Sequence, residues 1–133
     1  SLLVFLPTRL AIEPLCYLAF PMDKESRSPI NLRIGWTTLD TLEGARKLAS
    51  SLVNSGLAAC VQIDPPIHSV YLWKGSVESE PEFRIWVKYA APNEDALQER
   101  LRSDHPYETP QWIAVPAAAA LPAYADWIHR STS

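Results

Sequence analysis

The chain has 133 residues, of which 47% are hydrophobic and 20% are charged, and its formal net charge is −3. These values are typical of one globular domain with its own core and exclude a long disordered chain. The acidic balance offers no basic face for phosphates, so we expect no nucleic-acid partner.

Residues 1–30 are interpreted as an extension and linker ahead of a domain over residues 31–133. Residues 1–21 are mostly apolar, but three prolines and two charges interrupt them, and no basic stretch precedes them. This pattern predicts neither a membrane-spanning helix nor a signal peptide, and no membrane partner. We interpret Met22 as the natural start, because a polar linker follows it; the alternative is a genuine arm that packs on a neighbouring subunit.

The first half of the domain predicts a strand, a helix and two further strands. Polar and apolar residues alternate over 31–37, which is typical of a strand. Apolar residues at helical spacing predict a helix between Asp40, read with Glu43 as a capping box, and Gly56, read as the C-cap. Strands are expected over 57–63 and 67–74, split by a pair of prolines that cannot donate ladder hydrogen bonds.

The second half predicts a strand, a helix, a strand and a last helix. Alternation over 83–89 completes a long hairpin, acidic residues open a helix at Pro92, and His105-Pro106 ends it. A short strand over 111–115 and a helix over 121–128 follow. The run over 67–74 continues the strand over 57–63, so the two count as one bent strand. The order β-α-β-β-α-β plus a terminal helix then predicts an α+β, ferredoxin-like sandwich with an antiparallel sheet and helices on one face.

The strands carry an unusual number of large aromatic residues. These are Trp36, Tyr71, Trp73, Trp86 and Trp112. A sheet with one helix-covered face and so aromatic a second face should not remain bare in water. We therefore expect an oligomer, with the long hairpin as a natural place for strand addition between subunits.

Two cysteines, Cys16 and Cys60, are too few for a disulfide framework, and we expect a reducing, cytoplasmic location. No Cys-x-x-Cys or His-x-x-x-His pair is present, so local spacing predicts no metal site. No Gly-x-Ser-x-Gly elbow or glycine-rich phosphate loop is present either, and we expect no enzymatic activity.

Five ordered blocks with compatible spacing lie between residues 32 and 130. They are Leu57-Ala58-Ala59-Cys60, Ser69-Val70-Tyr71-Leu72-Trp73-Lys74-Gly75, Glu82 with Lys88, His105-Pro106-Tyr107-Glu108-Thr109-Pro110 and Tyr124-Ala125-Asp126-Trp127-Ile128. These blocks resemble the CutA family, the divalent-cation tolerance proteins. The resemblance implies a ferredoxin-like subunit in a tight homotrimer related to PII-type signalling proteins, with clefts between subunits. It also implies a link to tolerance of copper and other divalent metals, and no known reaction.

Cys60 and His105 are the candidate metal ligands, because a thiolate and a neutral imidazole suit copper or zinc. The structural alternatives are core packing for Cys60 and backbone hydrogen bonds at a helix end for His105. Thr37 stands where some members of the family carry a second cysteine, which weakens a Cu(I) site. We read His68 and His129 as exposed residues without a ligand role.

The second candidate site is a ligand cleft with a lysine and a carboxylate beside aromatic rings. Its members are Tyr71, Trp73, Glu82, Lys88 and Tyr107. Such a set suits a small anionic or zwitterionic ligand. The alternative is a structural ion pair with aromatic packing across a trimer interface.

We therefore predict a non-enzymatic, trimeric, CutA-like protein of divalent metal (copper) tolerance that requires no cofactor, with metal binding as its possible chemistry. The alternative is a PII-like sensor that binds a small metabolite between subunits. An acyl-phosphate hydrolase would need an arginine and an amide near a phosphate loop, and the sequence shows no such set. An RNA-binding sheet would need exposed aromatic residues with basic flanks and its typical aromatic motif, which the sequence also lacks. We expect high thermal stability, since unfolding would separate a large interface.

Overall fold

A computed structural model describes residues 30–132, and the expected extension over residues 1–21, with Cys16, lies outside the described residues. The elements in chain order are β1 (Leu32–Leu39), α2 (Leu42–Asn54), β2 (Cys60–Ile63), β3 (Ile67–Trp73), β4 (Ser76–Ala90), a 3-10 turn (Ala91–Asn93), α3 (Glu94–Asp104), β5 (Ile113–Pro116) and α4 (Pro122–Arg130). This order confirms the predicted ferredoxin-like α+β fold with a terminal helix.

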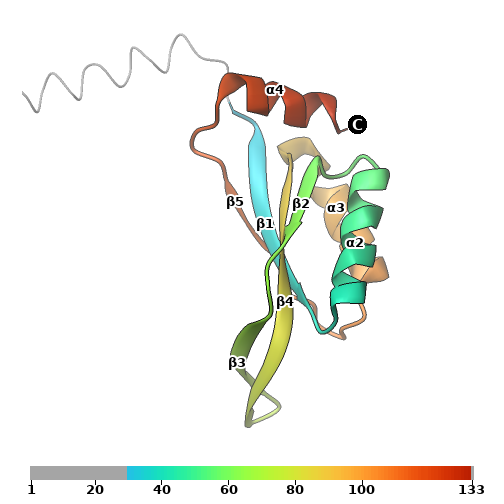
Figure 1. The fold of residues 1–133 in the computed structure, drawn as a ribbon, viewed down its shortest axis with the longest axis vertical. Coiled ribbons are helices and arrows are strands. Elements are labelled where there is room, and N and C mark those ends of the chain that lie inside the picture. The colour runs from blue at the N-terminus through green and yellow to red at the C-terminus, as the bar shows by residue number, and fades with distance from the viewer. Residues whose placement is uncertain (1–29, 133) are drawn as a thin grey trace, which may run out of the picture.

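The sheet is antiparallel and has the strand order β2-β4-β1-β5, with β3 also paired to β4. The 15-residue β4 serves two sets of partners. Its second half pairs with β1 and β2, so that Trp86 faces Trp36 and Lys88 faces Cys60. Its first half pairs with β3 alone, and this hairpin extends well beyond the helices (Figure 1).

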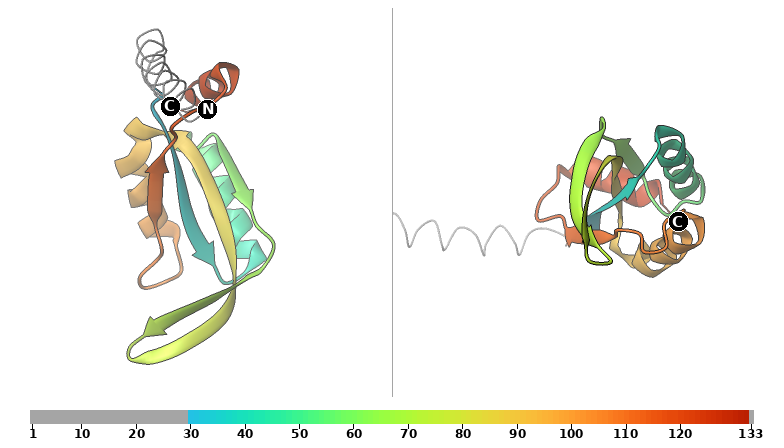
Figure 2. Two further views of the ribbon diagram at one scale, coloured as in Figure 1. Left: turned by 90° about the vertical axis from the view of Figure 1, so that its left-hand side faces the viewer. Right: turned by 90° about the horizontal axis from the view of Figure 1, so that it is seen from below.

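Helices α2 and α3 cover one face of the sheet (Figure 2). Ala45, Leu48 and Leu52 form the buried stripe of α2, and they belong to one core with Ile85 and Val87 of β4. The buried stripe of α2 lies on the helix face that the spacing of apolar residues at i, i+3 and i+4 predicts. The cap of α2 differs from the prediction, because Thr41 and not Asp40 accepts the hydrogen bond from the Gly44 amide.

Helix α4 lies across the end of the sheet, away from the hairpin (Figure 1). Ile128 of α4 packs in a second cluster with Leu32 and Ala59, and Ile30 packs against that cluster. Among residues 30–132, no helix is long and apolar enough to span a membrane.

The expected aromatic face is only partly formed. Trp36 and Trp86 do share the face opposite to α2 and α3, with their rings edge to face at 5.2 Å. Trp112 turns to the helix side instead, where it packs beside Tyr89 at 5.9 Å. It lies there because Gly35 of β1 has no side chain to exclude the indole ring.

Candidate functional site

The β3–β4 hairpin has two chemically different faces, because alternate residues of a strand point to opposite sides. Tyr71 and Trp73 share one face with Glu80 and Glu82, as their pairing register requires. The opposite face carries apolar side chains that are 69–74% exposed, which are Val70, Leu72 and Val77.

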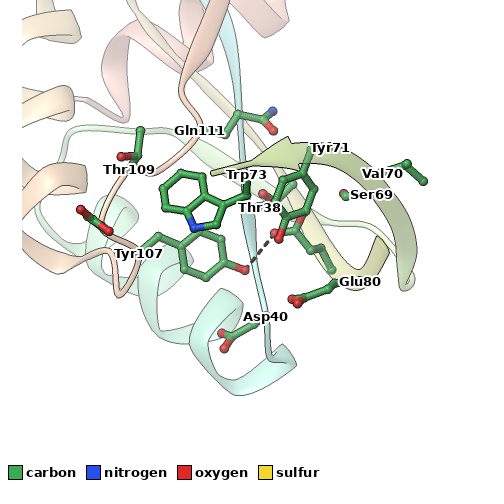
Figure 3. Close-up of a pocket in the computed structure, with 12 residues that line it drawn as sticks. Thr38, Asp40, Ser69, Val70, Tyr71, Trp73, Glu80, Tyr107, Thr109 and Gln111 are labelled. Atoms are coloured by element: carbon green, nitrogen blue, oxygen red, sulfur yellow. Dashed lines mark hydrogen bonds between the residues drawn. The ribbon is translucent and has the colours of Figure 1, made fainter. Parts of the chain in front are cut away.

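The first face of the hairpin closes over a cavity of about 590 Å³. The other walls come from the end of β1, with Thr38 and Asp40, and from the loop after α3, with Tyr107. Figure 3 shows the rings of Tyr71, Trp73 and Tyr107 gathered around this cavity. Its volume lies within the range of small-molecule sites in proteins.

Tyr107 is held in the wall by the way α3 ends. His105 precedes Pro106, which excludes it from helical geometry, and it closes α3 as the extended C-cap. The amide of Tyr107 then donates to Nδ1 of His105 at 3.2 Å. The Tyr107 hydroxyl donates to Glu82 at 2.8 Å, so the loop is tied to the hairpin across the cavity.

The described residues that line the cavity carry negative charge and no positive charge. Four of them are carboxylates, which are Asp40, Glu80, Glu82 and Glu108, and none is a lysine, arginine or histidine. Burial raises the pKa of Tyr107, and the carboxylate of Glu82 raises it further. The pKa of Tyr71 is also raised, first by burial and then by the glutamates around it. The potential in the cavity is therefore negative.

The structure brings together four of the five residues predicted for the ligand cleft. Tyr71, Trp73, Glu82 and Tyr107 all line the cavity. Lys88 does not lie with them, since six residues of extended strand, about 20 Å, separate it from Glu82 on β4. Its ammonium lies 5.5 Å from the centre of the Tyr124 ring on α4. The cavity within one chain therefore lacks Lys88, the positive charge that was expected to bind an anionic ligand.

The structure does not bring Cys60 and His105 together within one subunit. Cys60 lies opposite Lys88, whereas His105 contacts Thr38, which lies opposite Arg84, about 13 Å away along β4. The two also lie on different faces, because the side chain of Thr37 that contacts His105 shares the helix-covered face with Ile85. Among residues 30–132, no group of three or more His, Cys, Asp or Glu residues is arranged to hold a metal ion.

The ring nitrogens of His105 are both engaged. Nδ1 accepts from the Tyr107 amide, so Nε2 carries the proton and donates to the Thr38 carbonyl at 3.0 Å, with the Thr37 hydroxyl at 3.1 Å. Burial lowers the pKa of His105, which keeps the ring neutral. This geometry matches the structural alternative for His105 and leaves no lone pair for a metal.

Sequence reasoning missed the acidic wall of the cavity. The sequence pattern assigns Asp40 to a helix cap and gives Glu80 no role, whereas both line the cavity. A signal was present, because glutamates at 78, 80 and 82 recur with the period of a strand and share the face of the aromatic pair on β3.

Comparison with known proteins decides the family. The family model "CutA1 divalent ion tolerance protein" matches residues 34–131. The chain belongs to the CutA1 family. A "Divalent-cation tolerance protein CutA" of Thermus thermophilus is 38% identical over 95 residues, covering 71% of this chain and 92% of the relative. "Protein CutA, chloroplastic" of Arabidopsis thaliana is 35% identical over 109 residues, covering 82% of this chain but 60% of the relative.

Solved CutA structures share the fold. The structure of CutA from Synechococcus elongatus has a TM-score of 0.76 and 39% identity, and the match covers 80% of this chain and 95% of that one. The Thermus thermophilus Cut A1 structure has a TM-score of 0.75 and 35% identity, covering 77% of this chain and 99% of that one. The cavity lies wholly within the part of the chain that matches the CutA1 family.

Proposed function

We propose that this CutA1 family member is a non-enzymatic protein of divalent metal-ion tolerance, with copper as its principal metal. The family relationship supports the proposal, since relatives in Thermus and Pectobacterium are named divalent-cation tolerance proteins. The observation that carries it to this chain is the free thiol of Cys60, half-buried on the sheet face opposite to α2 and α3. A thiolate there is a ligand that soft copper prefers.

The proposed metal site needs a second copy of the chain. His105 is too far from Cys60 and has no free lone pair, and residues 30–132 hold no cluster of three or more metal-ligating side chains. We therefore propose that the other ligands come from a neighbouring subunit. We propose a homotrimer in which the exposed sheet face and the outer face of the hairpin are buried. The apolar side chains exposed on β3, β4 and β5 support this assembly, because large apolar side chains so exposed are costly to leave in water. They are Val70, Leu72, Val77, Ile113 and Val115.

Calorimetric titration of the full chain with copper and with zinc tests the metal proposal. Copper is expected to bind with micromolar or tighter affinity, and Cys60→Ser is expected to abolish that binding. Cys16→Ser is the matched control, and His105→Gln is expected to retain affinity, because the imidazole is already hydrogen-bonded. Equal copper binding by Cys60→Ser, or no binding by the parent, would overturn the proposal.

A second candidate function is PII-like sensing of a small molecule in the cleft. The observation that favours it is the cavity of about 590 Å³ with aromatic and polar walls. In this function metal tolerance is an indirect consequence of ligand binding, and a ligand would bind Cys60→Ser as well as the parent.

A cytoplasmic location remains part of the proposal. The names of two relatives point to other compartments, since the Arabidopsis protein is called chloroplastic and the Archaeoglobus fulgidus protein is called periplasmic. Fractionation of the native cells, with detection of the protein in each compartment, tests it.

A further inference from the structure

We propose that the cavity under the hairpin binds a small organic cation, one whose ammonium group lies against aromatic rings. This inference deepens the second candidate function and rests on the cavity being a ligand site. It follows from the chemistry of the cavity walls. The sequence suggested an anionic or zwitterionic ligand for this cleft, whereas the walls that the structure shows suit a cation.

The first step is the charge of the walls. Asp40, Glu80, Glu82 and Glu108 surround the cavity, and the lining residues include no basic side chain. Among these, Glu82 is 8% exposed, and its carboxylate accepts a hydrogen bond from the Tyr107 hydroxyl at 2.8 Å. A cleft lined by charges of one sign concentrates ligands of the opposite sign and repels anions.

The second step is independent of charge and concerns the rings. Tyr71, Trp73 and Tyr107 come from two separate parts of the chain, yet all three line the cavity (Figure 3). Aromatic faces attract ammonium groups through the ring quadrupole, and Trp is the strongest of them. The Trp73 ring already receives one such group, since the Lys74 ammonium lies 5.6 Å from its centre. Lys74 stands at the hairpin turn and is not among the lining residues.

The third step separates an organic cation from a metal ion. Calcium and magnesium require about six to eight oxygen ligands in one tight shell. The carboxylates of this cavity are spread over β1, β4 and the loop after α3, and no described group of three is close enough to hold a metal. Spread carboxylates with ring faces between them suit a larger cation of diffuse charge, for which a cavity of about 590 Å³ has room.

The test is a calorimetric titration of the full chain, in its native assembly, with three probes of similar shape and different charge. Choline carries a trimethylammonium group, 3,3-dimethylbutan-1-ol replaces it with a neutral tert-butyl group, and 3,3-dimethylbutanoate is an anion. Choline is expected to bind about 10-fold more tightly than the alcohol, and the anion more weakly than either. The preference for choline should shrink as salt is added, because the carboxylates attract it through solvent.

Two variants locate the site and one controls for charge. Glu80→Gln is expected to weaken choline binding about 3-fold or more while leaving the alcohol unchanged. Trp73→Leu should weaken choline about 5-fold or more. Glu99→Gln removes an equal charge from the exposed side of α3 and should leave choline within about 2-fold of the parent. Since Glu80 is exposed, its variant retains the fold even if Trp73→Leu does not.

Other outcomes overturn the inference in distinguishable ways. Equal affinity for choline and the alcohol, or tighter binding of the anion, would show a ligand site of another class, and the second candidate function would survive. Zinc binding that depends on Glu80, with no choline binding, would make the cavity a metal site. No binding of any probe or metal at this site would overturn the inference, while the sensing function would survive for a ligand of another shape.

Discussion

At the scale of single residues, Glu94 joins more of the structure than any residue of the candidate cleft. Its carboxylate accepts from Arg33 at 2.8 Å, Gln98 at 2.8 Å and Trp112 at 2.9 Å, and also from the hydroxyl of Tyr89. It therefore connects α3 with β1, β4 and the approach to β5. Burial by itself would raise the pKa of Glu94, but these donors outweigh burial and lower the pKa to about 2.

We predict that Glu94 makes the stability of the protein acid-dependent. Its pKa is about 2 in the folded chain against an ordinary 4.5, so its contribution is complete above the ordinary value and is lost as pH falls from there toward the folded value. The loss should be on the order of 3 kcal/mol, because each pH unit between the two pKa values corresponds to about 1.4 kcal/mol. Glu94→Gln should be less stable at neutral pH by a similar amount and should respond less to acid. Urea unfolding from neutral pH into the acid range measures both.

Glu99→Gln is the control for this prediction, since Glu99 forms only an exposed pair with Arg102 on the same helix. Its unfolding should follow that of the parent at every pH. Acid profiles of equal slope for the parent and Glu94→Gln would contradict the assigned role of Glu94.

At the scale of elements, the contact between β1 and the residue before β5 depends on one glycine. A Cβ added to Gly35 would lie 2.2 Å from the indole of Trp112, which is closer than real Cβ contacts allow. The missing side chain is therefore what lets Trp112 reach Glu94 and Tyr89 on the helix side of the sheet.

We predict that Gly35→Ala destabilises the fold by about 2 kcal/mol, because the ring has to shift within a packed core. This cost should exceed the usual gain from replacing a strand glycine by alanine. The free energy of unfolding in urea measures it. The double variant Gly35→Ala, Trp112→Leu should lose less than the sum of the two single variants, because the clash is gone. Additive losses would show that the ring does not limit this position.

At the scale of the whole molecule, the hairpin is notable because its outer face exposes apolar side chains that nothing in the described part of the chain covers. It projects beyond the helices (Figure 2). One face of the hairpin is polar and aromatic and lines the cavity, and the other face is apolar and exposed. Leu72 and Val77 are direct partners across the two strands of the outer face. An exposed apolar hairpin of this length is a site for association between copies.

We predict that Leu72→Glu weakens the proposed trimer. The parent should scatter light as about three times the 14.9 kDa chain, and the variant should shift toward the single-chain mass. Its melting temperature should fall and depend on protein concentration. Leu42→Glu, at an exposed leucine of α2, is the matched control and should stay assembled. A parent of single-chain mass would contradict the assembly.

The sequence by itself determined the order and type of the elements, as well as the family. Periodicity of two and of 3.6 residues reports which side of a strand or helix is buried, and that is a local property. Most boundaries moved by a few residues, as for β2, which begins at Cys60 and not at residue 57. The start of β4 was wrong by more, since the strand begins at Ser76 and not at residue 83. The shared face of Tyr71, Trp73 and Glu82 was also within reach, because pairing across a hairpin follows from its turn. Tyr107 comes from the loop after α3, so hairpin pairing does not place it in the site.

Only the tertiary structure decided the chemistry of the site. Glu82 and Lys88 have the same parity on β4, so the pattern placed them together, but parity says nothing of the distance along a strand. The sequence predicted Cys60 and His105 as ligands of one metal site. The strand register places Cys60 and the contacts of His105 at different points and on different faces of the sheet. A hydrophobic pattern records the burial of each residue, whereas a site depends on distances between residues far apart in the chain, which only the packed fold sets.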